Sequence, residues 1–251
     1  MTAFASRLAD LAQAMSLKYF RQPLDVERKA DLSPVTEADR AIETAMRAEI
    51  SVTYPRHGIF GEEHGSTNLQ NDNIWVIDPI DGTKSFITGM PTFGTLIAHL
   101  ENGYPSLGII SIPATAERWI GHAGEATLFE NKVCRTSGCS TLSAAMIYAT
   151  SPDNFDAKGL QVFDRISARA AMRRFGGDCY CYGLLASGHV DAVIEMNLQP
   201  YDYMALIPIV QGAGGVMSDW EGAPLHLASD GKVVAAATPE LHAEILDVIR
   251  G

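Results

Sequence analysis

The segment 75–86, WVIDPIDGTKSF, constrains the fold more than any other stretch of the chain. Its apolar start, 75–77, is typical of a buried strand. Pro79 has no backbone donor, so we expect the strand to end there. Asp78 and Asp81 then lie at the mouth of the strand, where two anions beside a hydrophobic core repel each other unless a cation or proton intervenes. The segment therefore predicts a strand that delivers a pair of carboxylates to a cation.

The residues after this pair indicate which cation and which ligand. An oxygen-rich site without histidine or cysteine suits Mg²⁺, which completes its shell with water and phosphate. Gly82 has a backbone free of the usual steric limits. If a helix begins at Gly82, the N–H groups of Gly82 and Thr83 point outward and can hold an anion. Acids followed by such a turn predict metal-assisted phosphoryl chemistry.

Charge and apolar pattern exclude several classes of protein. The 251 residues carry a net charge of −11 without a block of Lys or Arg, which argues against nucleic acid as the main partner. No apolar run is long enough for a membrane span, and residues 1–15 form an amphipathic pattern that predicts a first helix rather than a signal peptide. The cysteines lack zinc spacing and indicate reduced thiols of a cytoplasmic protein: Cys134, Cys139, Cys179 and Cys181.

The first half of the chain, residues 1–130, predicts helices and an antiparallel sheet. Apolar periodicity indicates helices over 3–20 and after Thr36. Residues 95–100 and 106–112 form two strands joined by an Asn-Gly turn, which is a strong hairpin signal. Short strands continue the sheet over ERWIGHAG and ATLFENKV. This half is of the α+β class.

The second half, residues 131–251, alternates strands and helices in α/β fashion. The expected strands are AAMIYAT, RRFGG and VDAVIEM, and the expected helices are 157–171, CYCYGLLASG and YMALIPIVQGAGG. The boundary between the halves is expected near residues 125–140.

Further acids have a plain structural interpretation beside a functional one. Asp39 and Thr36 have the spacing of a helix-capping pair. Glu62 and Glu63 follow a short strand and could be ordinary loop acids, and Asp202 at a helix start could be an N-cap. The residues alone leave these alternatives open.

Three segments together resemble a known family: GEEHG (61–65), WVIDPIDGTKSF (75–86) and YDYMALIPIVQGAGG (201–215). They are similar to the signatures of the inositol monophosphatase-like, Mg²⁺-dependent phosphatase superfamily, and the resemblance covers nearly the whole chain. It implies a layered αβαβα sandwich of the inositol monophosphatase and fructose-1,6-bisphosphatase type. It also implies a small phosphate monoester as substrate and a homodimer.

Within that superfamily the chain looks most like histidinol-phosphate phosphatases. The features are KSFITGMPTFGTLIAHL, Glu117–Trp119 and GGDCYCYGLLASG. Inositol phosphatases usually carry Thr-Asn where this chain has Lys84-Ser85, and Trp where it has Tyr201. The alternatives are an inositol monophosphatase, a broad sugar or nucleotide phosphatase and, more distantly, a regulatory binding protein of the same fold.

The resemblance also implies the metal ligands. Glu62, Asp78 and the Ile80 carbonyl would hold one Mg²⁺, while Asp78, Asp81 and Asp202 would hold a second. Glu62 would also support a third ion.

The remaining implied roles concern water, phosphate and the leaving group. Thr83 paired with Asp39 would orient or deprotonate the attacking water, and the Gly82 and Thr83 amides would hold phosphate oxygens. Asp178 and Glu195 are candidates to bind the cationic leaving group. Asp178 could instead be a helix N-cap, Lys84 could be a solvated side chain, and no histidine is given a role.

Overall fold

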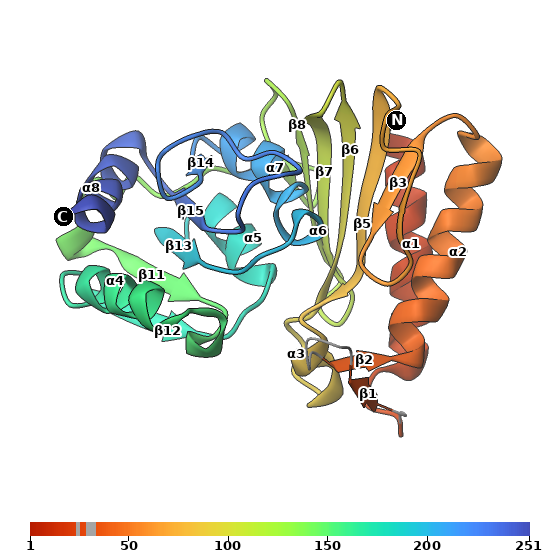
Figure 1. Cartoon of the computed structure of the whole chain (residues 1–251), viewed down its shortest axis with the longest axis horizontal. Helices are drawn as coiled ribbons and strands as arrows, with labels where there is room; N and C mark the ends of the chain where they lie inside the picture. The colour runs from red at the N-terminus through yellow and green to blue at the C-terminus, as the bar shows by residue number, and fades with distance from the viewer. Residues whose placement is uncertain (24–25, 29–33) are drawn as a thin grey trace.

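Two β-sheets alternate with three layers of helices (Figure 1). The computed structural model describes residues 1–23, 26–28 and 34–251. The outer layer on the first sheet holds α1 (Thr2–Tyr19) and α2 (Glu37–Thr53), the middle layer holds α5 (Tyr180–Ala186), α6 (Pro200–Tyr203) and α7 (Leu206–Gly212), and the far layer holds α4 (Ala157–Ser167) and α8 (Pro239–Arg250). This arrangement is the αβαβα sandwich that the resemblance implies.

The first sheet has eight strands, in the order β10-β9-β8-β7-β6-β5-β3-β4. Their bounds are β3 (Gly58–Gly61), β4 (Gly65–Thr67), β5 (Asn73–Asp81), β6 (Gly94–Glu101), β7 (Tyr104–Ile112), β8 (Glu117–His122), β9 (Leu128–Phe129) and β10 (Lys132–Val133). Neighbours are antiparallel except β3 and β5, which run parallel. The predicted antiparallel sheet is therefore confirmed except at this pair, because β4 folds back along β3 before the chain enters β5. The carboxyl ends of β3 and β5 consequently share one edge.

Strand β5 does not end at Pro79, contrary to the expectation from sequence. Its pairing with β6 shifts register between Asp78 and Asp81 and then resumes. The missing donor of Pro79 is tolerated within this bulge, and the Pro79 carbonyl accepts a hydrogen bond from Thr95 Oγ1 at 2.9 Å. The bulge re-aims the end of the strand, which carries both aspartates.

The predicted hairpin is confirmed by β6 and β7. Asn102 and Gly103 have φ of 53° and 84°, the left-handed conformations that a tight two-residue turn requires. A separate pair of strands, β1 (Val26–Arg28) and β2 (Pro34–Thr36), leads into α2.

The second sheet has the order β12-β11-β13-β15-β14. Its strands are β11 (Met146–Ala149), β12 (Met172–Phe175), β13 (Ala192–Glu195), β14 (Val216–Ser218) and β15 (Val233–Ala236), and the short helices η1 (Leu142–Ala144) and η2 (Pro152–Asn154) flank β11. The expected helix over 203–215 is divided into α6 and α7, and the helix expected to reach 171 ends at Ser167. The two-part division of the chain at residues 130 and 131 stays a prediction.

Apolar residues fill the space between successive layers. α1 and α2 bury Phe4, Ile42 and Met46 against the first sheet, and Trp119 and Tyr203 lie in the core between the two sheets. Among residues 1–23, 26–28 and 34–251, no helix has the length and apolar character to cross a membrane.

Candidate active site

Three carboxylates converge where β5 ends against α6. Asp78 is 2% exposed and Asp81 lies beyond the bulge, while Asp202 comes from α6, which packs on β5. One oxygen from each of the three carboxylates lies within 4.8 Å of the others. The structure thus brings together three residues that the sequence predicted as metal ligands.

Burial and mutual repulsion oppose ionisation of this cluster. Burial, with the charges of Glu62, Asp81 and Asp202, raises the pKa of Asp78 well above its ordinary value. Burial, and then the charge of Asp178, raises the pKa of Asp81 to about 7. Burial and the nearby Asp81 likewise raise the pKa of Asp202. Such a set of hard oxygen donors fits Mg²⁺, whose charge would offset both effects.

Glu62 joins the cluster from the turn after β3. Because β3 and β5 are parallel, this turn lies beside the end of β5, and the Glu62 charge reaches Asp78. The carbonyl of Ile80, another predicted ligand, accepts a hydrogen bond from Thr83 Oγ1 at 3.3 Å.

Asp39 forms the capping pair that the sequence predicts and also contacts Thr83. Thr36 caps α2, and its backbone N–H donates to Asp39 Oδ2 at 2.9 Å, so the pair forms a capping box. The second oxygen, Oδ1, lies 3.5 Å from Thr83 Oγ1, which donates to it. Burial raises the pKa of Asp39. The start of α2 therefore holds the buried Asp39 carboxylate against Thr83, the residue predicted to orient or deprotonate the attacking water.

Gly82 is the N-cap of α3 (Thr83–Ile87), as the sequence predicted. Its φ of 79° and ψ of 45° lie in the left-handed region that favours glycine. A Cβ added at Gly82 would lie 2.6 Å from Asp178 Cγ, so the site also requires the absence of a side chain.

Asp178 connects α3 to α5 and does not cap a helix, so the N-cap interpretation is wrong. The residue has φ of 47°, and α5 begins after Cys179 without a side-chain cap. Its Oδ2 accepts hydrogen bonds from Ser85 Oγ at 2.6 Å and Thr92 Oγ1 at 3.2 Å. Burial raises the pKa of Asp178. Sequence reasoning missed both hydroxyl partners, although Ser85 stood out as a departure from the usual motif.

Glu195 lies at the end of β13 and is 0% exposed. Its Oε1 accepts from the Thr150 N–H at 2.6 Å and from Thr150 Oγ1 at 2.7 Å, whereas Oε2 is buried with no hydrogen-bond partner among the described residues. Burial raises its pKa to about 8. Thr150 lines the cleft described next, so Glu195 lies beneath the wall and supports it.

The cleft above the carboxylates has a volume of about 390 Å³. Acidic and hydroxyl side chains dominate its wall, and exposed Lys84 lies among them. The lining residues are Glu62, Asp81, Gly82, Thr83, Lys84, Ser85, Thr150, Ser151, Asn154, Gly176, Asp178, Asn197, Leu198 and Asp202.

This arrangement of acids, threonine and glycine turn agrees with comparisons to known proteins. A family profile described as the inositol monophosphatase family matches residues 1–250. The chain belongs to the inositol monophosphatase family. Members of this family are phosphatases and are generally Mg²⁺-dependent, in agreement with the oxygen cluster.

Individual relatives span nearly the whole chain. The bifunctional phosphatase IMPL2, chloroplastic, of Arabidopsis thaliana is 44% identical over 98% of this chain and 73% of its own length. A histidinol-phosphatase of Chlorobaculum parvum is 36% identical over 92% of this chain and 90% of its own. The solved structure of an inositol monophosphatase from Zymomonas mobilis superposes with a TM-score of 0.91 and 45% identity, covering 99% of this chain and 97% of that one. All three relatives are described as phosphatases, which supports the phosphatase assignment. Their descriptions differ, so they do not single out one substrate.

Proposed function

We propose that the protein is a Mg²⁺-dependent phosphomonoesterase that hydrolyses histidinol phosphate to histidinol and phosphate, a step of histidine biosynthesis. The observation that carries the proposal is the set of Asp78, Asp81 and Asp202 oxygens within 4.8 Å of one another, beside a cleft of about 390 Å³. Histidinol-phosphatases from Chlorobaculum parvum and Mycobacterium tuberculosis, 36% and 32% identical to the chain, support the choice of substrate.

Two to three Mg²⁺ ions would be held by carboxylates at the floor of the cleft. The ligands are Glu62, Asp78, the Ile80 carbonyl, Asp81 and Asp202. When bound, Mg²⁺ supplies positive charge that acidifies a water molecule and neutralises the phosphate group.

The other residues position the reactants. The Thr83 hydroxyl donates a hydrogen bond to Asp39. The lone pairs of Thr83 Oγ1 are then free to accept a hydrogen bond from the attacking water and so to orient it. The backbone N–H groups of Gly82 and Thr83 hold the phosphate oxygens. Water attacks phosphorus directly, and the products are inorganic phosphate and the free alcohol.

Selectivity would come from acids facing the leaving group. Histidinol carries an amine and an imidazole, both of which can be cationic, and buried Asp178 lines the cleft where an ester group would lie. Glu195 would act from beneath the wall, by accepting the hydrogen bond that holds the Thr150 hydroxyl in place.

A second candidate substrate is an inositol phosphate. The specific support is the Zymomonas mobilis structure, described as an inositol monophosphatase, at 45% identity. Measured rates on the two esters separate these candidates.

The test compares phosphate release from histidinol phosphate, inositol-1-phosphate, fructose-1,6-bisphosphate and a phosphoadenosine, with and without Mg²⁺. We expect the highest kcat/KM for histidinol phosphate and no turnover in excess chelator or in Asp81→Asn. Near-equal rates on all four esters would overturn the histidinol assignment but leave the phosphatase. Full activity of Asp81→Asn would overturn the metal mechanism, and an unchanged KM in Asp178→Asn would remove Asp178 from the specificity site.

We further propose that the protein is a homodimer and that it is located in the cytoplasm. Exposed Met172 and Phe175 on the edge strand β12 offer apolar surface to a second copy, and all four cysteines are free thiols. Sedimentation at several protein concentrations tests the dimer.

A further inference from the structure

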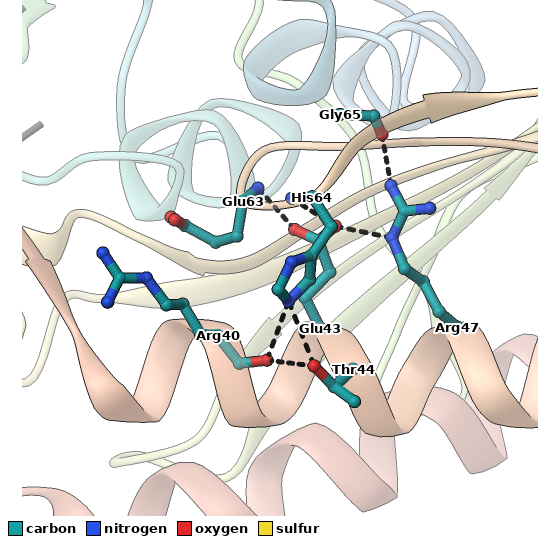
Figure 2. Close-up of polar contacts among 7 residues, drawn as sticks. All are labelled: Arg40, Glu43, Thr44, Arg47, Glu63, His64 and Gly65. Atoms are coloured by element: carbon teal, nitrogen blue, oxygen red, sulfur yellow. Dashed lines mark hydrogen bonds and ion pairs between the residues drawn. The ribbon is translucent and has the colours of Figure 1, made fainter. Parts of the chain in front are cut away.

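A buried carboxylate of α2 holds the turn that carries Glu62. Glu43 is 0% exposed, and its Oε2 accepts the backbone N–H of Glu63 at 2.6 Å while Oε1 accepts that of His64 at 3.1 Å (Figure 2). A carboxylate that accepts two backbone N–H groups out of water forms strong, charge-assisted hydrogen bonds. The turn between β3 and β4 is therefore fixed to the helix at two consecutive residues.

Neighbours of Glu43 on the same helix extend this attachment. Arg47 is 14% exposed, and its Nε lies 2.7 Å from Glu43 Oε1 while its Nη2 donates to the Gly65 carbonyl. The His64 ring lies over α2, with Nε2 3.0 Å from Thr44 Oγ1 (Figure 2). Residues 63–65 are thus bound in succession to one face of α2.

The residue before Glu62 is adapted to the same carboxylate. A Cβ added at Gly61 would overlap the Glu43 carboxyl group, so Gly61 allows the strand end to approach α2 closely. Glu62 therefore lies between Gly61, which contacts Glu43, and Glu63, which is hydrogen-bonded to it. The backbone of Glu62 cannot shift without disturbing Glu43.

Helix α2 links this turn to the threonine side of the site. Asp39 and Glu43 are one helical turn apart and share a face. Asp39 accepts from Thr83, and Glu43 accepts from the Glu62-bearing turn. One rigid helix consequently sets two parts of the cleft relative to each other.

We infer that Glu43 is a positioning residue that fixes the Glu62 carboxylate in the geometry needed to bind Mg²⁺. Arg47 neutralises and orients the Glu43 carboxylate. The inference rests on the proposed function, because it assigns Glu43 to the placement of a proposed metal ligand. Groups that orient metal ligands from behind typically change metal affinity about 10- to 100-fold when they are replaced.

The test measures metal binding directly. Mn²⁺ binding to the full chain is followed by the loss of the free-ion EPR signal, and the Mg²⁺ concentration for half-maximal phosphatase activity is measured in parallel. In Glu43→Gln, one N–H acceptor is replaced by an amide donor, so we expect both constants to rise by about 10-fold or more. The KM for the ester at saturating Mg²⁺ should stay unchanged.

Two further variants separate positioning from general loss of stability. Asp191→Asn is a matched control, because Asp191 is 4% exposed and accepts the Met146 N–H at 2.7 Å but does not line the cleft. It should lower the Tm without changing the metal constants. In Glu62→Gln, adding Glu43→Gln should cause no further loss of affinity, since Glu43 acts through Glu62.

The outcomes are separable. Wild-type metal constants in folded Glu43→Gln, or additive losses with Glu62→Gln, overturn the inference. If Glu43→Gln does not fold, Arg47→Gln replaces it, with a smaller rise of the same constants expected and no rise overturning the inference. Unchanged Mn²⁺ affinity in Asp81→Asn overturns the proposed metal site, whereas unchanged affinity in Glu43→Gln alone overturns only the role of Glu43.

Discussion

Gly82→Ala tests the geometry at the start of α3. An alanine in the left-handed conformation of Gly82 costs about 1–2 kcal/mol. Its Cβ would also lie 2.6 Å from Asp178 Cγ and 2.9 Å from Asp178 Cβ, so Asp178 must move and lose its bonds from Ser85 and Thr92. Each bond contributes about 1 kcal/mol or more, so the free energy of unfolding should fall by about 3–5 kcal/mol.

The assay is urea unfolding of a double-mutant cycle with Asp178→Gly. Glycine suits the left-handed Asp178 and removes the overlapping atoms, so the two hydrogen bonds are lost only once in the double variant. The combined loss should then be about 2 kcal/mol smaller than the sum of the single losses. Gly124→Ala is the matched control, with φ of 78° and no atom within 4 Å of the added Cβ, and should lose only about 1–2 kcal/mol. Strict additivity, or an equal loss in Gly124→Ala, would refute this reasoning.

Two other predictions concern pH and packing. Burial raises the pKa of Asp81 to about 7 and that of Glu195 to about 8, so the protonated forms favour folding, and chelator-treated protein should lose stability as pH rises from about 4 to about 8. Mg²⁺ should therefore raise the Tm more at pH 8 than at pH 5.5, and an equal increment at both pH values in calorimetry would contradict the coupling. In Gly183→Ala, the new Cβ would lie 2.9 Å from three atoms of the Trp119 ring, which should cost about 1–3 kcal/mol in urea unfolding. The cost should largely disappear when Trp119 is first replaced by alanine.

Local chemistry made much of the fold and site predictable. The Thr36 cap, the Asn-Gly turn and the Gly82 helix start each follow from residues within a few positions of one another. The clustering of Asp78 and Asp81 with Asp202 needed more than local pattern, and the family resemblance supplied it.

What escaped prediction depends on contacts between distant segments. Strand β5 continues past Pro79 because its pairing with β6 resumes at Asp81 after the bulge, where the Thr95 hydroxyl donates a hydrogen bond to the Pro79 carbonyl. Asp178 accepts hydrogen bonds from Ser85 and Thr92, about ninety residues away in the chain, which no spacing in the sequence reveals. The parallel pairing of β3 with β5 likewise follows from the path of β4.

Because α6 packs against β5, an ion bound by Asp81 and Asp202 would link two distant parts of the chain. Asp81 ends a strand of the first sheet, whereas Asp202 belongs to a helix that follows most of the second sheet in the chain. An ion shared by both would act as a removable cross-link between distant parts of the chain, and because only the folded chain forms the site, binding would stabilise the folded state. If Mg²⁺ binds there, as we propose, chelation should weaken the contact between the two sheets before other parts of the structure.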